Sequence, residues 1–276
     1  MTATLEITQA QFVTTVWLAR PDVRNAFNET MVAELTQTFA NLGANPEVRV
    51  IVLAARGPAF CAGADLEWMR RVAGYTQEQN LNDARALAHM LHTLYTCDKP
   101  VIARVQGDAF AGGIGLVAAC DMAVASTHAT FCLSEVKLGL VASTISPYVI
   151  RAMGERQARR YVLSAEKFDA QEAQRIGLIH TLATPEALDA HVNEIQNALL
   201  QASPTAVTQA KRLLREVAAR PLDAALIEDT AQRIATARAS EDGREGIAAF
   251  LEKRKPRWVR EVDAVRASAQ GDDEMM

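Results

Sequence analysis

The stretches AFCAGADL (residues 59–66) and QGDAFAGGIG (residues 106–115) share one organisation. Each follows an apolar run that predicts a buried strand, at Val48–Ala54 and at Val101–Val105, and each leads into a segment with helical character. Their small residues allow a ligand to approach the backbone closely. Strand, glycine-bearing loop and helix thus occur twice in succession, which is typical of an α/β fold with helices packed on a sheet.

The alternation of strands and helices extends to both sides of these loops. β-branched and apolar runs predict further strands at Val13–Leu18, Met122–Ser126 and Thr130–Leu133. Apolar residues at helical spacing predict helices at Thr30–Leu42, from Asp65 through Met69, at Gln77–Tyr95 and from Gly112 to about Cys120. The side chain of Asp65 is expected to cap the second of these helices.

The C-terminal part of the chain has a different character. From about Gln157 onward no strand is predicted, whereas the segments near 186–200, 204–219 and 222–240 have helical periodicity. We therefore expect an α/β core over residues 1–200 and a helical region over residues 201–276. No low-complexity linker separates the two, so the helical region is expected to pack on the core or on a neighbouring subunit.

The composition excludes several classes of function. With 276 residues, 49% of them hydrophobic, the chain can bury a substantial core. A net charge of −4 gives no basic excess, so no nucleic-acid partner is expected, and the basic run Lys253–Arg257 is interpreted as a solvated face. The longest apolar run, Ala109–Cys120, is shorter than the roughly 20 residues that span a bilayer, so no membrane partner is expected.

The cysteines, histidines and N-terminus bear on localisation and metal binding. The four cysteines form no CxxC pair and fit no zinc spacing, which indicates free thiols in a reducing compartment. The first residues lack the basic start and apolar stretch of a secretory signal. His89 and His92 stand three residues apart without matching Cys, Asp or Glu ligands, so no metal site is predicted. We expect a soluble cytoplasmic protein.

The two loops place the N-termini of two helices where each can act on a ligand. The first turn of a helix carries unpaired N–H groups and the positive end of the helix dipole. Two such ends that converge would stabilise a developing negative charge. Phosphate binding is an alternative, although neither loop matches GxxxxGKS/T or GxGxxG. Glycines that only permit tight turns and close packing are a second alternative, and the pattern alone leaves all three open.

Three segments in order resemble the enoyl-CoA hydratase/isomerase (crotonase) family: AFCAGADL, VQGDAFAGGIGLVAACD and FCLSEVKLGL. The similarity extends from RPDVRNAFN near the start to FLEKRKPRW near the end. The resemblance implies a crotonase-like spiral of repeated strand–strand–helix units, with a helical C-terminal region that serves in oligomerisation. It also implies trimers, often stacked into hexamers, in which the segment Phe250–Trp258 reaches a neighbouring subunit's CoA site.

The resemblance also implies a binding site for a coenzyme A thioester, with no cofactor besides the coenzyme A of the substrate. One oxyanion-hole N–H would come from Ala64 and the other from Gly112, since Ala111 replaces the first glycine of the family's second loop. Residues around Arg24, Ala26 and Ala62 would hold the nucleotide end. Further candidates for substrate or CoA binding are the neighbours Asp65, Leu66, Trp68 and Gly113. Trp68 is equally compatible with core packing.

Glu135 is the candidate that moves protons. Its mostly apolar setting would raise the pKa of its carboxyl group, but most glutamates are exposed, so the residue alone leaves both interpretations open. In the family this position carries a catalytic glutamate, which favours acid/base catalysis. Family hydratases typically have a second glutamate at the position that matches Gly115. With Glu135 alone, hydration, Δ3,Δ2-isomerisation and acyl-CoA binding without turnover remain open.

A finer resemblance concerns the substrate. FCAGADLEWM, Gly115 and SEVKLGL followed by ISPYVIRAMGERQARRY are together similar to bacterial methylglutaconyl-CoA and carboxygeranoyl-CoA hydratases, which act in leucine or acyclic terpenoid breakdown. Their substrates carry a distal carboxylate, so a cation is expected in the acyl pocket. Lys137 would face the same side as Glu135 if the segment is extended, and Arg70 and Arg71 are further candidates. We therefore expect a hydratase that adds water to such a 2-enoyl-CoA.

Overall fold

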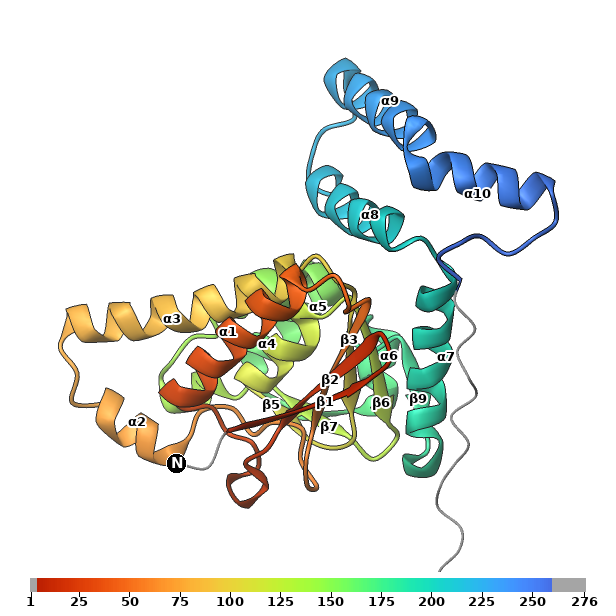
Figure 1. Ribbon diagram of the computed structural model, residues 1–276. Helices are drawn as coiled ribbons and strands as arrows, with labels where there is room; N and C mark the ends of the chain where they lie inside the picture. The colour runs from red at the N-terminus through yellow and green to blue at the C-terminus, as the bar shows by residue number, and fades with distance from the viewer. Residues whose placement is uncertain (1–3, 260–276) are drawn as a thin grey trace, which may run out of the picture.

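The computed structural model describes residues 4–259, and Figure 1 shows its ribbon. A six-stranded sheet lies at its centre, in the order β1-β2-β3-β4-β6-β9. The first two strands pair antiparallel, and each later strand is added parallel to its neighbour. The strands are β1 (Leu5–Ala10), β2 (Val13–Leu18), β3 (Val50–Ala55), β4 (Val101–Val105), β6 (Met122–Ser126) and β9 (Thr181–Ala183).

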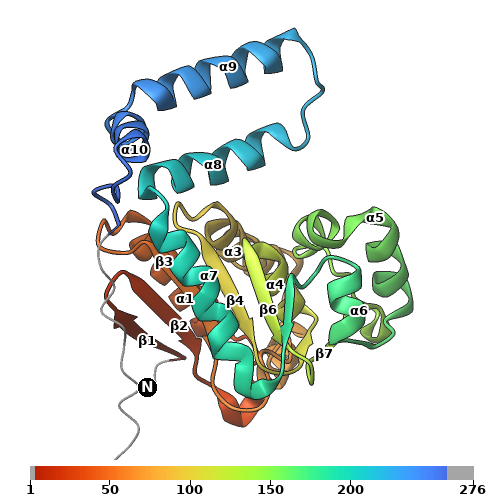
Figure 2. The same cartoon turned by 90° about the vertical axis from the view of Figure 1, so that its right-hand side faces the viewer.

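The central strand β3 is buried along its whole length because helices cover both faces of the sheet. Val50, Val52 and Ala54 face a core that includes side chains of α7 (Leu188–Gln201). The alternate residues of β3 belong to the larger core on the opposite face. Figure 2 shows α7 crossing the sheet on its own side. A strand that is buried on both faces has a continuous apolar sequence, and β3 has the sequence VIVLAA.

The helices vary widely in length. Before α7 come α1 (Glu29–Ala44), α2 (Leu66–Val72), α3 (Gln77–Thr96), α4 (Gly112–Ala119), α5 (Ser146–Ser164) and α6 (Ala170–Arg175), with single 3-10 turns at Pro21–Val23, Glu135–Leu138 and Pro185–Ala187. Within the larger core, α3 packs against α1, and α4 packs against α3 and α5. Gly154, with φ 76° and ψ 155°, interrupts α5. Every helix between residues 4 and 259 falls short of the length or apolarity that crossing a bilayer requires.

A second, three-stranded sheet holds the segment that leads to Glu135. Its strands are β5 (Ala109–Phe110), β7 (Thr130–Cys132) and β8 (Phe168–Asp169), in the order β5-β7-β8. The ring of Phe168 stacks on Phe131 of β7, with 5.5 Å between centroids, and packs against Tyr161 of α5 at 4.2 Å. These aromatic contacts fix β7, so the residues that follow it start from a rigid position.

Three helices at the C-terminal side stand away from the sheet (Figures 1 and 2). We call them the C-terminal arm: α8 (Pro204–Val217), α9 (Ala224–Ala239) and α10 (Glu241–Leu251). The guanidinium of Arg49 donates to the carbonyls of Leu200 and Trp258, at 2.9 Å each, and so ties the segment after α10 to the end of α7. The large apolar side chains that the arm exposes, including Leu222 in the connection between α8 and α9, are Leu214, Leu222, Ile227, Ile234, Ile247, Phe250 and Leu251.

The structure confirms the α/β core and the C-terminal helices, and it adds strands that were not predicted, among them the short β5 of the second glycine-bearing loop. The strands predicted at 13–18, 101–105 and 122–126 form at those residues. The expectation that strands end before Gln157 is wrong, because β8 and β9 follow it. Both are only two or three residues long and are stabilised by pairing with distant strands, which local sequence patterns do not reveal. The strand β1 was not predicted either, since five of its six residues are exposed.

Candidate active site

The two glycine-bearing loops lie side by side. The first follows β3 and the second follows β4, which is its parallel neighbour in the sheet. The carbonyl of Asp108 accepts hydrogen bonds from the N–H groups of Phe60 (3.0 Å) and Cys61 (3.1 Å). The N–H of Phe110 returns a hydrogen bond to the carbonyl of Cys61 at 2.9 Å. The loops are therefore joined through their backbones before the helices begin.

Close approach of the loops requires glycine at two positions. A Cβ atom added to Gly113 would lie 2.5 Å from the carbonyl oxygen of Cys61, closer than real Cβ contacts occur. Gly63 has φ +92°, and a Cβ atom there would lie 3.1 Å from the Cβ of Ala111. Side chains at these positions would push the two loops apart. The glycines thus have a packing role, whether or not a ligand binds.

Ala64 offers a backbone N–H that forms no hydrogen bond within residues 4–259. The N–H of Phe27 donates to the carbonyl of Gly63 (2.7 Å), and the N–H of Asp65 donates to the carbonyl of Phe27 (2.8 Å). In this parallel bridge the residues on either side of Ala64 bond to Phe27, so the N–H of Ala64 points the other way. It meets no acceptor among residues 4–259, and Ala64 is exposed.

Gly112 supplies a second such donor at the first turn of α4. Ala111 is the N-cap, and its carbonyl accepts the N–H groups of Ile114 (3.0 Å) and Gly115 (3.4 Å). The N–H of Gly112 precedes these bonds and finds no acceptor in the described part of the chain. Gly112 is only half-buried, so a ligand can reach this N–H at the positive end of the helix.

The backbone of Ala111 is strained. Its φ of 49° and ψ of −119° lie in a region that ordinarily only glycine adopts. The N–H of Ala111 donates to the carbonyl of Cys132 at 2.8 Å, which holds the residue in this conformation and joins the second loop to β7. The loop therefore keeps the shape that a glycine would give it, at a conformational cost of about 1–3 kcal/mol.

Ala111→Gly should therefore stabilise the protein. The release of strain exceeds the extra chain entropy of glycine, so we expect the free energy of unfolding to rise by about 1 kcal/mol. Urea unfolding followed by circular dichroism measures this change, and turnover should stay at the wild-type rate. A variant that unfolds at lower urea than wild type would contradict the assignment of strain to this residue.

Glu135 starts the 3-10 turn that follows β7. Since Cys132 at the end of β7 accepts the N–H of Ala111, this turn begins close to the N-terminus of α4. The Oε2 atom of Glu135 is buried and has no hydrogen-bond partner among residues 4–259. Burial raises the pKa of the carboxyl group above its ordinary value, and a hydrogen bond from the residue's own backbone opposes this only in part. Glu135 is therefore a candidate for proton transfer on a segment that is joined to the start of α4.

The sequence from residue 8 to residue 261 matches the model of the family described as enoyl-CoA hydratase/isomerase. The chain belongs to this family. The crystal structure of an enoyl-CoA hydratase from Shewanella pealeana is 45% identical, with a TM-score of 0.90, over 92% of this chain and 96% of that one. This similarity confirms the expected crotonase-like fold.

Two curated relatives have names that specify their substrates. The 2,3-dehydroadipyl-CoA hydratase of Escherichia coli K12 is 32% identical, over 91% of this chain and 97% of its own length. The mevalonyl-coenzyme A hydratase sidH of Aspergillus fumigatus is 34% identical, over 87% of this chain and 89% of its own length. This enoyl-CoA hydratase/isomerase family member thus resembles hydro-lyases that act on several different acyl groups.

The position where two-glutamate hydratases of the family carry their second carboxylate is filled with apolar atoms here. A Cβ atom added to Gly115 would overlap the side chain of Ile145, which is 2% exposed. The Cδ2 atom of Leu91 would lie 3.7 Å away on another side. No larger side chain fits at Gly115 unless Ile145 moves. The helix α4 accordingly offers no second glutamate.

The premise on which Lys137 was expected to face the same side as Glu135 is wrong. Residues 135–138 form a 3-10 turn rather than an extended segment, so side chains two positions apart point in different directions. The Nζ atom of Lys137 donates to the carbonyl of Ala165 at 2.6 Å. Ala165 ends α5 in a left-handed conformation, and this contact satisfies one of the free carbonyls there.

Two side chains just after Ala64, those of Asp65 and Trp68, form hydrogen bonds within the protein. Asp65 caps α2 as predicted, since its Oδ1 accepts the N–H of Glu67 at 2.8 Å. Its Oδ2 accepts a hydrogen bond from Arg20 (2.8 Å), and although burial opposes its charge, these contacts hold the pKa of Asp65 below its ordinary value. Trp68 is buried and donates to Asp83 at 3.0 Å. Of the predicted side chains here, Leu66 is the exposed one.

The residues predicted to hold the nucleotide end of coenzyme A lie together. The N–H of Ala62 donates to the carbonyl of Arg24 at 3.0 Å, the side chain of Arg24 is exposed, and Ala26 is buried close by in sequence. Sequence reasoning missed Arg20 and Asn25, which shape this loop. Arg20 donates to the carbonyl of Ala26 at 2.6 Å.

Asn25 is fully buried and adopts the left-handed conformation, with φ 55°. Its Nδ2 donates to the carbonyls of Arg56 (2.8 Å) and Ala59 (2.9 Å), and its Oδ1 accepts the N–H of Arg20. The tolerance of asparagine for positive φ is the only local signal that points to it. Asn25 therefore fastens the Arg24 loop to the start of the first glycine-bearing loop.

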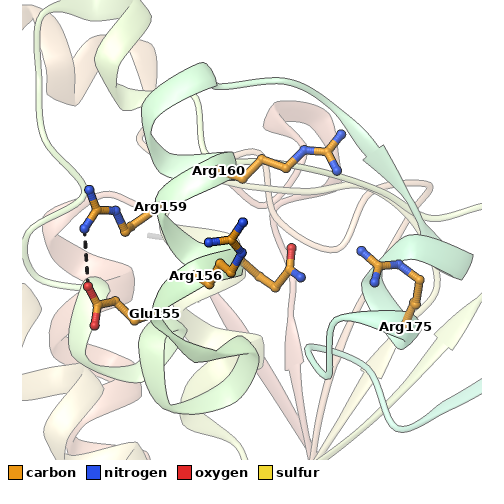
Figure 3. Close-up of a pocket in the computed structure, with 6 residues that line it drawn as sticks. Glu155, Arg156, Arg159, Arg160 and Arg175 are labelled. Carbon is orange, nitrogen blue, oxygen red and sulfur yellow. Dashed lines mark ion pairs between the residues drawn. The ribbon is translucent and has the colours of Figure 1, made fainter.

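A cavity of about 770 Å³ lies elsewhere, on α5 and α6, and no predicted site residue lines it. Figure 3 shows the arginines that surround it, which are Arg156, Arg159, Arg160 and Arg175. Arg160 pairs with Glu166 at 2.6 Å, and Arg175 pairs with Glu172 at 2.5 Å. Much of the positive charge is neutralised within the protein, so this cavity is not assigned to the site.

Among residues 4–259 no three or more His, Cys, Asp and Glu side chains gather in a way that could hold a metal ion. His89 and His92, which stand at a helical spacing on α3, are both exposed and lack further ligand side chains in that part of the chain.

Proposed function

We propose that this family member adds water across the double bond of a 2-enoyl-CoA thioester, with Ala64, Gly112 and Glu135 as its catalytic groups. The observation that carries the proposal is the buried Oε2 of Glu135, which has no partner among residues 4–259 and lies on the segment joined to the start of α4. The two unused N–H groups supply an oxyanion hole for the thioester oxygen. Such preorganised donors are strongest when charge develops during the reaction.

The proposed reaction uses one carboxyl group for both proton transfers. Glu135 removes a proton from water while the water oxygen forms its bond to C3 of the enoyl group. The electrons of the double bond move to the thioester oxygen, which the N–H groups of Ala64 and Gly112 stabilise. The protonated Glu135 then delivers its proton to C2, the carbonyl re-forms, and the carboxylate is regenerated. One glutamate therefore suffices, which agrees with the packing of Ile145 against Gly115.

We further propose a carboxylated, branched acyl group such as 3-methylglutaconyl. The relative that is named for 2,3-dehydroadipyl-CoA supports the distal carboxylate, because adipic acid is a dicarboxylic acid, and the branch rests on the resemblance to methylglutaconyl-CoA hydratases. Of the three candidate cations, Lys137 bonds to the carbonyl of Ala165, and Arg71 forms a two-pronged ion pair with Glu29 at 2.7–2.8 Å. Arg70 is exposed and makes no ion pair among residues 4–259. Arg70, on the helix that follows Ala64, is therefore the best candidate for the distal carboxylate.

Arg70→Met tests this substrate assignment. We expect KM for 3-methylglutaconyl-CoA to rise about tenfold, since a charge-assisted contact is lost, while KM for crotonyl-CoA stays within about twofold. Steady-state kinetics with both thioesters measures the ratio. Lys137→Met is the matched control and should leave the ratio unchanged. Equal changes for both substrates in Arg70→Met would remove Arg70 from the acyl pocket.

We also propose that the C-terminal arm assembles the chain into trimers or stacked hexamers. Its exposed apolar side chains support this, since a neighbouring subunit would cover them. Phe250, which is 82% exposed at the end of α10, is one of the side chains that such a neighbour would cover. Trp258, in contrast, donates to the carbonyl of Gln201 within its own chain. Residues 260–276 of the proposed oligomerisation region lie outside the described residues.

The experiment that tests the function follows the products of three thioesters by mass spectrometry: crotonyl-CoA, 3-methylglutaconyl-CoA and a 3-enoyl-CoA. The proposal expects the two 2-enoyl substrates to gain the mass of one water, the second of them faster. Conversion of the 3-enoyl compound alone, with no mass change and a shifted double bond, would instead establish a Δ3,Δ2-enoyl-CoA isomerase. Binding of the thioesters without any turnover would establish an acyl-CoA-binding protein.

A further inference from the structure

The helix α4, which presents the N–H of Gly112, contains no polar side chain. Its sequence is GGIGLVAA, and most of its residues are buried among apolar neighbours. Apolar packing is not directional, so it fixes the position of a helix along its own axis less sharply than hydrogen bonds do. The polar contacts that set this position lie at the two ends, at Ala111 and at Asp121.

The contact at the C-terminal end joins α4 to the start of β4. The N–H of Asp121 donates to the carbonyl of Val101 (3.0 Å), and the N–H of Val101 donates to Oδ2 of Asp121 (2.8 Å). The strand β4, the second glycine-bearing loop and α4 are thus closed into a ring at Val101 and Asp121. A shift at this closure is transmitted along an eight-residue helix to Gly112.

Lys211 of α8, in the C-terminal arm, makes a further polar contact with Asp121. Its Nζ lies 2.6 Å from Oδ2 of Asp121 and donates to the carbonyl of Lys99 at 2.9 Å. Lys211 is 9% exposed, which is unusual for lysine. Asp121 itself is half-buried, with 26% of its side chain exposed, so a carboxylate there that loses its cation is only partly compensated by water and is expected to rearrange or take up a proton. Either change alters the hydrogen bond that the N–H of Val101 donates to Oδ2 of Asp121.

We propose that Lys211 is a positioning residue for the oxyanion hole: by holding Asp121 against Val101, it sets the place of α4 and so of the Gly112 N–H. The inference rests on the proposed role of Gly112. It connects the C-terminal arm with the chemistry of the site, a role that is distinct from the arm's part in assembly.

Arg212 provides a matched control on the same helix. It pairs with Asp98 through two hydrogen bonds, at 2.9 and 2.6 Å. Asp98 lies in the same connection between α3 and β4 as Lys99, and its hydrogen bonds go to Arg212 and Thr208 of α8 rather than to Asp121. Loss of Arg212 therefore loosens the attachment of the arm while it leaves the Asp121 closure intact.

The experiment compares Lys211→Met, Lys211→Arg, Asp121→Asn and Arg212→Ala in the full chain. For Lys211→Met we expect kcat to fall about tenfold with KM nearly unchanged, because the N–H donor is misplaced while CoA contacts persist. Lys211→Arg should recover most of the rate, and Arg212→Ala should keep it. The kcat of Asp121→Asn should fall less, because asparagine retains an acceptor for the N–H of Val101. If Lys211→Met does not fold, Asp121→Asn takes its place in the comparison.

A second measurement reads the oxyanion hole without turnover. A 4-aminocinnamoyl-CoA thioester absorbs at longer wavelength when its carbonyl is polarised, so the red shift on binding should shrink in Lys211→Met and stay in Arg212→Ala. An unchanged red shift in Lys211→Met, or equal losses in Lys211→Met and Arg212→Ala, would overturn the inference. Absence of hydration by the wild type would overturn the proposed function instead, and the red shift would still test Lys211.

Discussion

Replacing Glu135 with glutamine is expected to lower kcat for hydration by about 10³-fold, with little change in KM, because the only proposed proton carrier is lost while thioester binding is kept. The reaction is followed by the loss of the 2-enoyl absorbance and by the mass of the product. Glutamine has the shape of glutamate, so the oxyanion hole is left in place and accounts for the residual rate. A variant that keeps more than about a tenth of the wild-type kcat would exclude Glu135 as the acid/base.

The same substitution has a pH signature. A base must be ionised to accept a proton, so kcat/KM of the wild type should fall as pH drops through the pKa of Glu135. Since burial raises this pKa, the fall should occur at higher pH than for an ordinary glutamate. Measuring kcat/KM from acidic to neutral pH tests this, and the residual activity of Glu135→Gln should lack this limb.

Stability should change in the opposite sense to activity. A raised pKa in the folded state means that the fold favours protonated Glu135, a contribution that is present at low pH and lost as pH rises through that pKa. At neutral pH the ionised carboxylate, with its buried Oε2 unpaired, therefore weakens the fold. Glu135→Gln should be more stable than wild type by about 1 kcal/mol at neutral pH, and the difference should vanish in acid.

Gly113→Ala is expected to lower both the stability and the activity of the protein. Its Cβ would lie 2.5 Å from the carbonyl oxygen of Cys61 and 2.9 Å from the Cβ of Cys61, and a backbone carbonyl cannot rotate away. The two loops must separate, which should cost about 2 kcal/mol of stability. The same separation moves the N–H of Gly112 relative to that of Ala64, so kcat should fall about 100-fold. Urea unfolding and steady-state kinetics measure the two effects.

Gly74→Ala is the matched control for this prediction. A Cβ at Gly74 would lie 3.5 Å from the carbonyl oxygen of Arg71, an ordinary contact, and Gly74 is exposed. Stability should stay within about 0.5 kcal/mol of wild type and activity should be unchanged. If Gly113→Ala were equally harmless, the close approach of the loops would not be needed for the site.

Features with a strong local cause were predictable from sequence. The strands at 101–105 and 122–126 are runs of residues that the sheet buries, and the Asp65 cap follows from one side chain before a helix. The pairing of the two loops also follows, because parallel neighbouring strands bring their ends together. In each case the physical cause lies within a few residues of the feature.

Features that depend on distant contacts were not predictable. Lys137 was placed by assuming an extended segment, whereas the turn at 135–138 is set by β7 and by bonds within residues 135–140. Arg20 and Asn25 act through partners more than thirty residues away, such as Asp65 and Ala59. The unpaired Oε2 of Glu135 is likewise a property of its surroundings and not of its sequence neighbours.

The order of strands in the central sheet has a consequence for how the chain is made. Along the chain, each new strand of this sheet pairs with the strand of the same sheet that was made before it. A nascent chain can therefore lengthen the sheet strand by strand as it leaves the ribosome, without opening any pairing already made. The C-terminal arm emerges after these strands, when Asp121 and Lys99 are already in place to receive Lys211. Formation of that ion pair therefore has to wait until most of the chain has been made.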